Sequence, residues 1–259
     1  MKPSVRKLAV LCTLAVLTSA CASQPPSPTN TPVPISTPTA APSPTPLPSS
    51  TSPPPTATST PTSTATPYPI FRDDFAGTLQ PGWTWLREND SKWSLTSEPG
   101  FLRIVLEGGS FHRNLFIREV ESEDFEITTH VLFKPTTNFQ IAALLVYQDD
   151  ATMIKFGRAF CDVQNLCVGN GIYFDNMQNA QFSGTNYATD TVLQDEAYLR
   201  ITKIGSRLTG SYSEDGTNWM VIGVHESFMA DPKVGLVAGQ SNVVGAIALF
   251  DYFTLMEIH

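Results

Sequence analysis

From residue 70 onward, short apolar runs alternate with turn-forming residues. The runs are rich in β-branched and aromatic side chains, and Gly, Pro, Asn or Asp bounds each of them. Such a pattern is typical of strands in a sandwich or barrel, and no long segment keeps the 3.6-residue period of a helix. The pattern predicts an all-β unit with strands at 93–96, 101–106, 125–133, 140–148, 153–160, 171–175, 198–204, 208–213, 219–224, 234–238 and 246–258.

One run, at residues 142–146, is apolar at both odd and even positions. Alternate residues of a strand face opposite sides, so this run predicts a central strand that is covered on both faces. The pair Asp215 and Gly216 suits a tight hairpin turn that needs positive φ. Together these features favour two stacked antiparallel sheets.

The first 20 residues have the character of an export signal. An apolar run of 13 residues, 8–20, follows the basic residues Lys2, Arg6 and Lys7. As a helix this run rises only about 20 Å, whereas the hydrocarbon core of a bilayer is roughly 30 Å thick. Residues 1–20 therefore predict a signal peptide rather than a spanning helix.

The apolar run ends in the sequence LTSAC at residues 17–21. This ending resembles the bacterial lipobox, although Leu17 lies four positions before the cysteine instead of the usual three. The resemblance implies that Cys21 becomes the first residue and carries lipid, which would anchor the protein to the outside of the cell membrane or outer membrane. An ordinary secretory leader with an incidental cysteine is the alternative.

Residues 21–67 are dominated by Pro, Thr, Ser and Ala, and no charged residue occurs from residue 8 to residue 71. A segment with so few large apolar side chains buries too little surface to offset its conformational entropy. We therefore predict a disordered linker at 21–67, acting as a stalk for a folded domain at 68–259.

Charge and cysteine usage narrow the functional classes. The formal net charge of −8 excludes a nucleic-acid partner bound through general electrostatics, which requires a basic face. Cys12 lies in the leader, so Cys161 and Cys167 remain in the folding unit, where export favours a disulfide between them. A zinc site is the rival interpretation, but it needs further ligands.

Several motifs occur in a consistent order, namely RDDF at 72–75, KWSL at 92–95, LVYQDD at 145–150, YSEDG at 212–216 and FDYF at 250–253. In order and spacing they resemble the concanavalin A-like jelly-roll module at the C-terminus of family 43 β-xylosidases. The resemblance covers nearly all of residues 70–259, and it implies an antiparallel two-sheet jelly-roll sandwich in a sugar-associated setting. In those xylosidases the hydrolytic carboxylates lie on a separate propeller, so the resemblance does not imply hydrolysis by this sandwich.

Carbohydrate is the partner that this setting predicts, because sugar C–H faces stack on aromatic rings while polar side chains bond the hydroxyls. Tyr147 and Lys155, on adjoining predicted strands, are the first pair to test. Lys155 and Arg158 have opposite parity and share a face only if Gly157 marks a β-bulge. The predicted ligand-binding residues are Trp85, Gln140, Tyr147, Lys155, Arg158 and Tyr173.

Acidic residues suggest two further sites. Asp73, Asp74 and Asp251 lie at the two ends of the domain, where the first and last strands of a jelly roll often adjoin, so they are candidates for a structural Ca²⁺ site. Glu121, Glu123 and Glu126 have the spacing of the E-x-D-x-x-E motif in family 16 glucanases, with Glu123 in place of its Asp, which gives a glycoside hydrolase using Glu121 and Glu126 as an alternative function. Strand parity argues against it, and a structural protein-interaction module is the remaining alternative.

The lipobox predicts a measurable change. Substituting Cys21→Ala should abolish incorporation of labelled fatty acid and shift the full chain from the detergent phase to the aqueous phase in Triton X-114 partitioning. Cys12→Ala is the matched control and should keep both properties, because it leaves the modified thiol in place. Continued labelling of the Cys21→Ala chain would contradict the anchor.

Overall fold

The computed structural model describes residues 69–109, 112–163, 167–182, 187–189, 195–239 and 243–258. The predicted signal peptide, Cys21 and the linker lie outside these residues. Within them, the only helical element is the short 3₁₀ turn η1 (Asp90–Lys92), and all other regular elements are strands. No helix in these ranges is long and apolar enough to cross a membrane.

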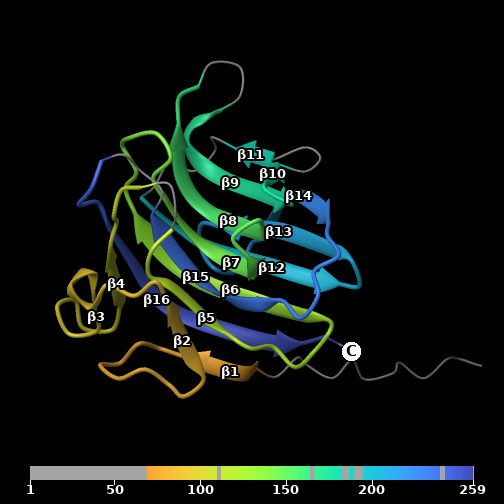
Figure 1. Cartoon of the computed structure of the whole chain (residues 1–259), viewed down its shortest axis with the longest axis horizontal. Helices are drawn as coiled ribbons and strands as arrows, with labels where there is room; N and C mark the ends of the chain where they lie inside the picture. Colours follow the sequence, from red (N-terminus) through yellow and green to blue (C-terminus); the bar gives the residue numbers. More distant parts are fainter. Residues whose placement is uncertain are drawn as a thin grey trace, which may run out of the picture. The chain divides into compact units, whose positions relative to one another are not determined.

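Two antiparallel sheets stack as a sandwich (Figure 1). The first sheet has the order β14 (Met220–Glu226), β13 (Arg207–Ser213), β12 (Glu196–Ile204), β6 (Phe125–Phe133), β16 (Ile247–Glu257), β4 (Leu102–Val105) and β3 (Trp93–Ser94), and β1 (Pro69–Asp73) also pairs with β16. The second has the order β10 (Gln181–Phe182), β9 (Gly169–Gln178), β8 (Thr152–Cys161), β7 (Ile141–Asp149), β15 (Lys233–Gly239), β5 (Leu115–Arg118) and β2 (Trp83–Leu86), and β11 (Tyr187–Thr189) also pairs with β9. The all-β, two-sheet jelly-roll prediction is confirmed.

The main core lies between the two sheets and follows the alternation of the long strands. In β6, Phe125, Ile127 and Val131 are buried against residues such as Leu144 and Phe156 of the second sheet. Burying an aliphatic or aromatic side chain of this size stabilises the fold by roughly 1.5–3 kcal/mol. This core draws on both sheets and fixes which face of each strand points inward.

Strand β7 is apolar on both faces, as the run at 142–146 predicted. Ala142, Leu144 and Val146 belong to the core between the sheets. Ala143 and Leu145 belong to a second apolar cluster on the outer face of the second sheet. The candidate site lies on this outer face.

Arg158 does not share a face with Lys155. The pairing of β7 with β8 runs without a shift past Gly157, and its only irregularity lies between Tyr147 and Asp149. Arg158 therefore points between the sheets, is 0% exposed, and donates long hydrogen bonds of 3.4 and 3.5 Å to the carbonyl oxygen of Phe133. The assignment of Arg158 to a ligand-binding face is corrected, because a bulge at Gly157 would have been required.

Five strands are absent from the sequence-based set. The strands β1, β2, β5, β10 and β11 have between two and five residues each. Segments so short carry too little alternation to be distinguished from loops. Their pairing with longer neighbours, such as β5 with β15, makes them strands.

Gly157 is a tightly packed point of the second sheet, because a Cβ there would lie 2.1 Å from the carbonyl oxygen of Ala142. Gly157→Ala should therefore lower the free energy of unfolding by about 3 kcal/mol, as overpacking against backbone does. Gly239→Ala is the matched control, since its nearest neighbour would be 3.6 Å away, and its effect should stay within about 0.5 kcal/mol. Urea unfolding of the two variants measures the difference, and equal stabilities would contradict the packing.

Candidate ligand-binding site

The outer face of β8 and β9 combines charged, aromatic and very small side chains. Lys155 lies directly opposite Asp175, and Gly157 lies directly opposite Tyr173. The next pair on this face is Ala159 and Gly171. Of these small residues Ala159 lines a cavity on this face, together with Lys155, Tyr173 and Asp175.

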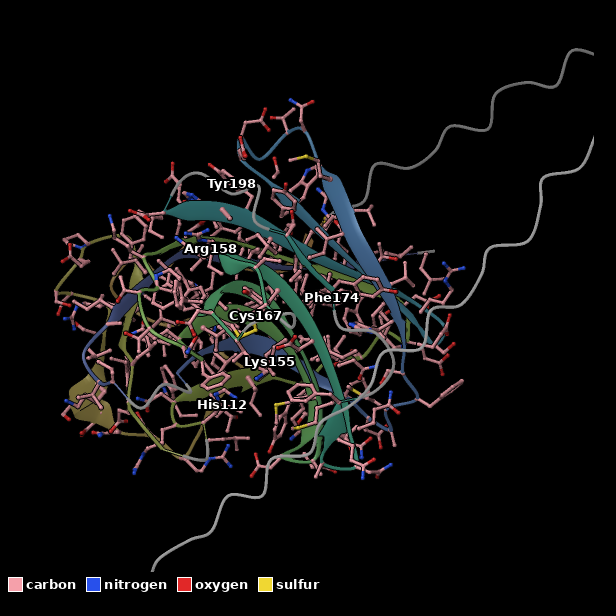
Figure 2. The ribbon with its side chains drawn as sticks, turned by 90° about the horizontal axis from the view of Figure 1, so that it is seen from above. His112, Lys155, Arg158, Cys167, Phe174 and Tyr198 are labelled. Carbon is pink, nitrogen blue, oxygen red and sulfur yellow. A yellow bond between two sulfur atoms is a disulfide. The ribbon has the colours of Figure 1, made fainter. Side chains whose placement is uncertain are left out.

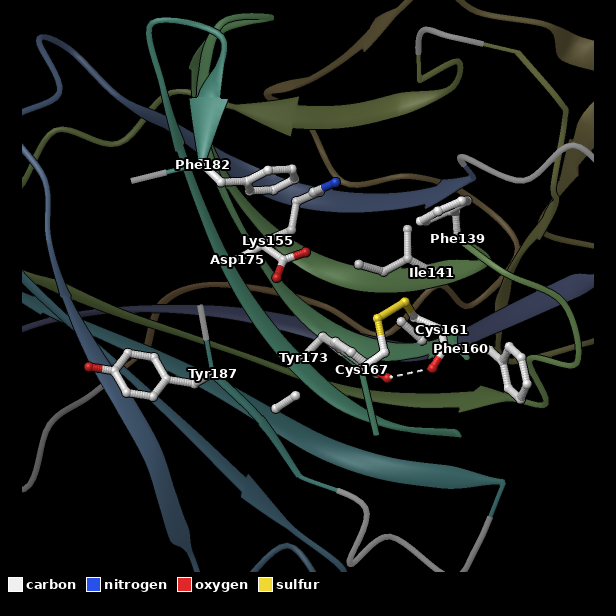
Figure 3. Close-up of a pocket in the computed structure, with 12 residues that line it drawn as sticks. Phe139, Ile141, Lys155, Phe160, Cys161, Cys167, Tyr173, Asp175, Phe182 and Tyr187 are labelled. Atoms are coloured by element: carbon white, nitrogen blue, oxygen red, sulfur yellow. Dashed lines mark hydrogen bonds between the residues drawn. A yellow bond between two sulfur atoms is a disulfide. The ribbon is translucent and has the colours of Figure 1, made fainter. Parts of the chain in front are cut away.

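This cavity has a volume of about 440 Å³ (Figure 3). Its size falls within the range of about 300–1,000 Å³ that is usual for small-molecule sites. The lining is largely apolar and aromatic, with one ammonium and one carboxylate. The described residues that line it are Phe139, Ile141, Lys155, Ala159, Phe160, Cys161, Cys167, Tyr173, Asp175, Phe182, Tyr187 and Ala188.

Two aromatic rings at the cavity are unusually open to solvent. Phe139 is 52% exposed and Phe182 is 63% exposed, and they come from different segments, the turn before β7 and the strand β10. Large exposed apolar side chains at a cavity often mark a contact with a ligand. Figure 3 shows both rings beside Lys155 and Ile141, so a ligand entering the cavity would meet them.

A disulfide forms part of the wall. Cys161 and Cys167 are bonded, with their Cα atoms 5.4 Å apart. The Tyr173 hydroxyl donates to the carbonyl oxygen of Gly169 at 2.7 Å and accepts from the Val168 N–H at 3.1 Å. The covalent bond and the two hydrogen bonds hold this side of the cavity in place.

Lys155 is a buried ammonium at the edge of the cavity. It is 5% exposed, and its Nζ lies 3.3 Å from Nε2 of His112, which is outside the lining (Figure 2). Burial lowers the pKa of Lys155 because it penalises the charged form, and the nearby Asp175 carboxylate partly opposes this. The Lys155 amino group therefore contacts His112 at the edge of the cavity.

Asp175 presents an open hydrogen-bond acceptor. Among the hydrogen bonds of the described residues, none involves its carboxylate, although burial raises the pKa of this carboxyl and the positive charges of Lys155 and His225 only partly counteract that. In Figure 3 the carboxylate turns toward the disulfide while the Lys155 amino group lies beside the Phe182 ring. A carboxylate oxygen at a largely apolar cavity gains from a hydrogen bond, so a donor from a ligand would be stabilised there.

The predicted ligand-binding residues divide into two groups. Lys155 and Tyr173 meet at the cavity, and Tyr147 lies in the same outer apolar cluster with its hydroxyl donating to Asp150 at 3.1 Å. Gln140 and Trp85 lie elsewhere, as does Arg158.

Gln140 and Trp85 have structural contacts. Gln140 Oε1 accepts from the backbone N–H groups of Thr136 and Thr137, at 2.7 and 3.2 Å, and so closes a turn. Trp85 packs at the edge of the inter-sheet core, with ring centroids 4.8 Å from Trp93 and 4.2 Å from Phe116. Neither residue lines the cavity, so the structure does not bring these two predicted ligand-binding residues together with Lys155 and Tyr173.

The sequence-based set missed the rings Phe139, Phe160 and Phe182. The available signal was the placement of Phe139 and Phe182 next to turns, where an apolar ring has no core to enter. The pairing of β8 with β9 places Asp175 opposite Lys155 at the cavity.

The three aspartates do not fit a calcium site. Asp73 already accepts three N–H groups at 2.9 Å, from the backbone of Phe75 and Gln80 and from Nε1 of Trp83. Asp74 is paired with Arg72 and Asp251 with His130. Within the described ranges no group of three or more His, Cys, Asp or Glu side chains is arranged to hold a metal, whereas Ca²⁺ takes six to eight oxygen ligands.

Glu121 and Glu126 are held in different surroundings. Glu126 accepts from the Thr202 hydroxyl at 2.9 Å and lies 3.3 Å from Nε of Arg200, on the outer face of the first sheet. Glu121 lines a separate cavity of about 320 Å³ together with Phe71 and Arg118. The structure does not bring the two carboxylates together on one cavity.

Comparison with known proteins identifies relatives. A family model described as the concanavalin A-like C-terminal domain of β-xylosidase matches residues 72–255. A xylan 1,3-β-xylosidase of a Vibrio species is 27% identical over 159 residues, which are 59% of this chain and 29% of that enzyme. The chain thus spans less than a third of this relative's length.

Solved structures share the fold. The GH43 protein BlXynB of Bacillus licheniformis superposes with a TM-score of 0.64 at 20% identity, over 72% of this chain and 39% of that one. The xyloglucan PUL protein GH43B of Bacteroides ovatus gives 0.63 at 20% identity, over 74% and 40%. The exoplasmic domain of VIP36, in a form bound to Ca²⁺ and Man2, gives 0.52 at 15% identity, over 71% and 86%.

Asp175→Asn should make the protein more stable at neutral pH. Folding raises the pKa of the Asp175 carboxyl above its ordinary value of 3.8. Above pH 3.8 the folded protein therefore binds more protons at this group than the unfolded chain does. The free energy of unfolding consequently falls as the pH rises through the raised pKa. Asparagine does not titrate and avoids this loss. Thermal unfolding should show a higher Tm at pH 7, at roughly 2–4 °C per kcal/mol, and no gain below pH 3.8. A lower Tm at pH 7 would mean that the carboxylate is structural.

Proposed function

Because the chain belongs to the family of concanavalin A-like C-terminal domains of β-xylosidases, we propose that it is a non-catalytic carbohydrate-binding module. The observation that carries the proposal is the Asp175 carboxylate, which faces a cavity of about 440 Å³ and has no hydrogen-bond donor among the described residues. Sugar hydroxyls are donors of the required kind.

The rings around the carboxylate supply the other half of sugar recognition. Phe139 and Phe182 both line the cavity and present exposed faces to it. The C–H faces of a sugar would pack on these rings while its hydroxyls bond Asp175. A single site of this size gives affinities in the micromolar to millimolar range, about −8 to −4 kcal/mol.

The acid groups of the described lining support binding without hydrolysis. Asp175 is the sole carboxylate among the described residues that line the cavity. Glycosidases generally need two carboxyl groups, about 5–5.5 Å apart for retention and about 6.5–9.5 Å apart for inversion. The described lining therefore supplies a hydroxyl acceptor and lacks the pair that would break a glycosidic bond.

The proposal includes display at the cell surface. Lipid on Cys21 would hold the protein to the membrane, and the 46 residues from 22 to 67 would extend at most about 140 Å in a polyproline II conformation. A stalk of this reach would present the cavity to glycans outside the cell.

Calorimetry on the full chain in mild detergent tests the function, with xylo-, gluco- and manno-oligosaccharides as probes. Wild type should bind at least one series with a micromolar to millimolar Kd. Asp175→Asn should weaken that binding about tenfold or more, since it removes an ionised acceptor. Asp231→Asn is the matched control, because it makes the same chemical change at an exposed turn outside the cavity, and should bind like wild type.

Two outcomes would contradict the proposal. One is no binding of any glycan series by the wild-type chain. The other is release of reducing sugar by the purified wild-type chain with a loss of activity in Glu126→Gln, which would establish the hydrolase alternative instead.

A further inference from the structure

Resting on the proposed function, we infer that the cavity selects sugars without an acidic group, and that Asp175 is the residue that excludes uronic acids. A ligand that enters the cavity meets one charged group before the other. The positions of Asp175 and Lys155 determine which group it meets first.

The two charged groups at the cavity differ in how open they are. The Lys155 side chain is 5% exposed, and its amino group lies 3.3 Å from His112, which does not line the cavity. Asp175 is only partly buried, and its carboxylate turns toward the disulfide and the body of the cavity (Figure 3). A ligand therefore meets the carboxylate before the ammonium.

Apart from Lys155 and Asp175, the polar side chains of the described lining are the two tyrosines, which carry no positive charge to offset the carboxylate. The Tyr187 hydroxyl donates to the carbonyl oxygen of Val224 at 3.1 Å, and the Tyr173 hydroxyl donates to Gly169. Both donors are thus already used by the protein. A ligand therefore finds a hydrogen-bond acceptor in Asp175, but the protein offers few donors for the ligand's own acceptor atoms.

Desolvation strengthens the discrimination. Two carboxylates brought together in a largely apolar cavity repel each other more strongly than in water, because the local dielectric constant is lower. The whole chain also carries a formal charge of −8, which repels acidic polysaccharides before contact. A neutral sugar meets neither cost and gains hydrogen bonds to Asp175.

The test uses probes that share one ring and differ at a single position. Methyl β-xyloside, methyl β-glucoside, methyl β-glucuronoside and the methyl ester of the glucuronoside carry hydrogen, CH₂OH, carboxylate and a neutral ester at the same carbon. Their Kd values for the full chain are measured at pH 7 by NMR titration. The glucuronoside should bind at least about tenfold more weakly than its methyl ester, because the two differ mainly in charge.

Asp175→Asn should lower the ratio of the glucuronoside Kd to the methyl ester Kd to within about threefold. Asp231→Asn should leave this ratio as it is in wild type. A glucuronoside that binds as tightly as its ester to wild type would overturn the inference, since Lys155 would then be the group that receives the ligand. Binding of the acidic sugar alone would overturn it too and leave the proposed function intact. If neither these probes nor the oligosaccharides bind, the inference and the proposed function are both wrong.

Discussion

The antiparallel register between β8 and β9 is the constraint on which the candidate site depends. It sets Lys155 opposite Asp175 and Gly157 opposite Tyr173, on the face that points away from the inter-sheet core. A slip of one residue would turn every side chain of the slipped strand to the other face. The core on the inner face prevents this, because Phe156 and Phe174 fill it. Packing between the sheets therefore determines the chemistry on the outer face.

The cavity is a place where the fold tolerates an electrostatic cost. Burial lowers the pKa of Lys155 and raises that of Asp175, so both groups are held against their charged forms. A domain with apolar clusters on both faces of β7 has stability available to offset this cost. Binding sites commonly retain such unfavourable groups, because a ligand satisfies what the protein leaves open.

Family membership and site chemistry answer different questions here. The family model and the solved relatives establish the sandwich, but this chain matches only part of each longer enzyme. Function on a shared fold depends on the residues of the site. On this chain the described lining of the cavity combines a carboxylate, an ammonium and two exposed rings with small and apolar side chains.

The class of fold can be predicted from the sequence alone, because long strands such as 125–133 and the doubly apolar run at 142–146 carry their periodicity locally. The opposite parity of Lys155 and Arg158 can be predicted in the same way. The packing of the strands then sets which of the two faces the cavity, makes Asp175 the neighbour of Lys155 and bonds Asp73 to Trp83. Alternation along a strand tells which residues share a face. Which strand lies alongside, and which face turns inward, depends on contacts between segments far apart in the chain.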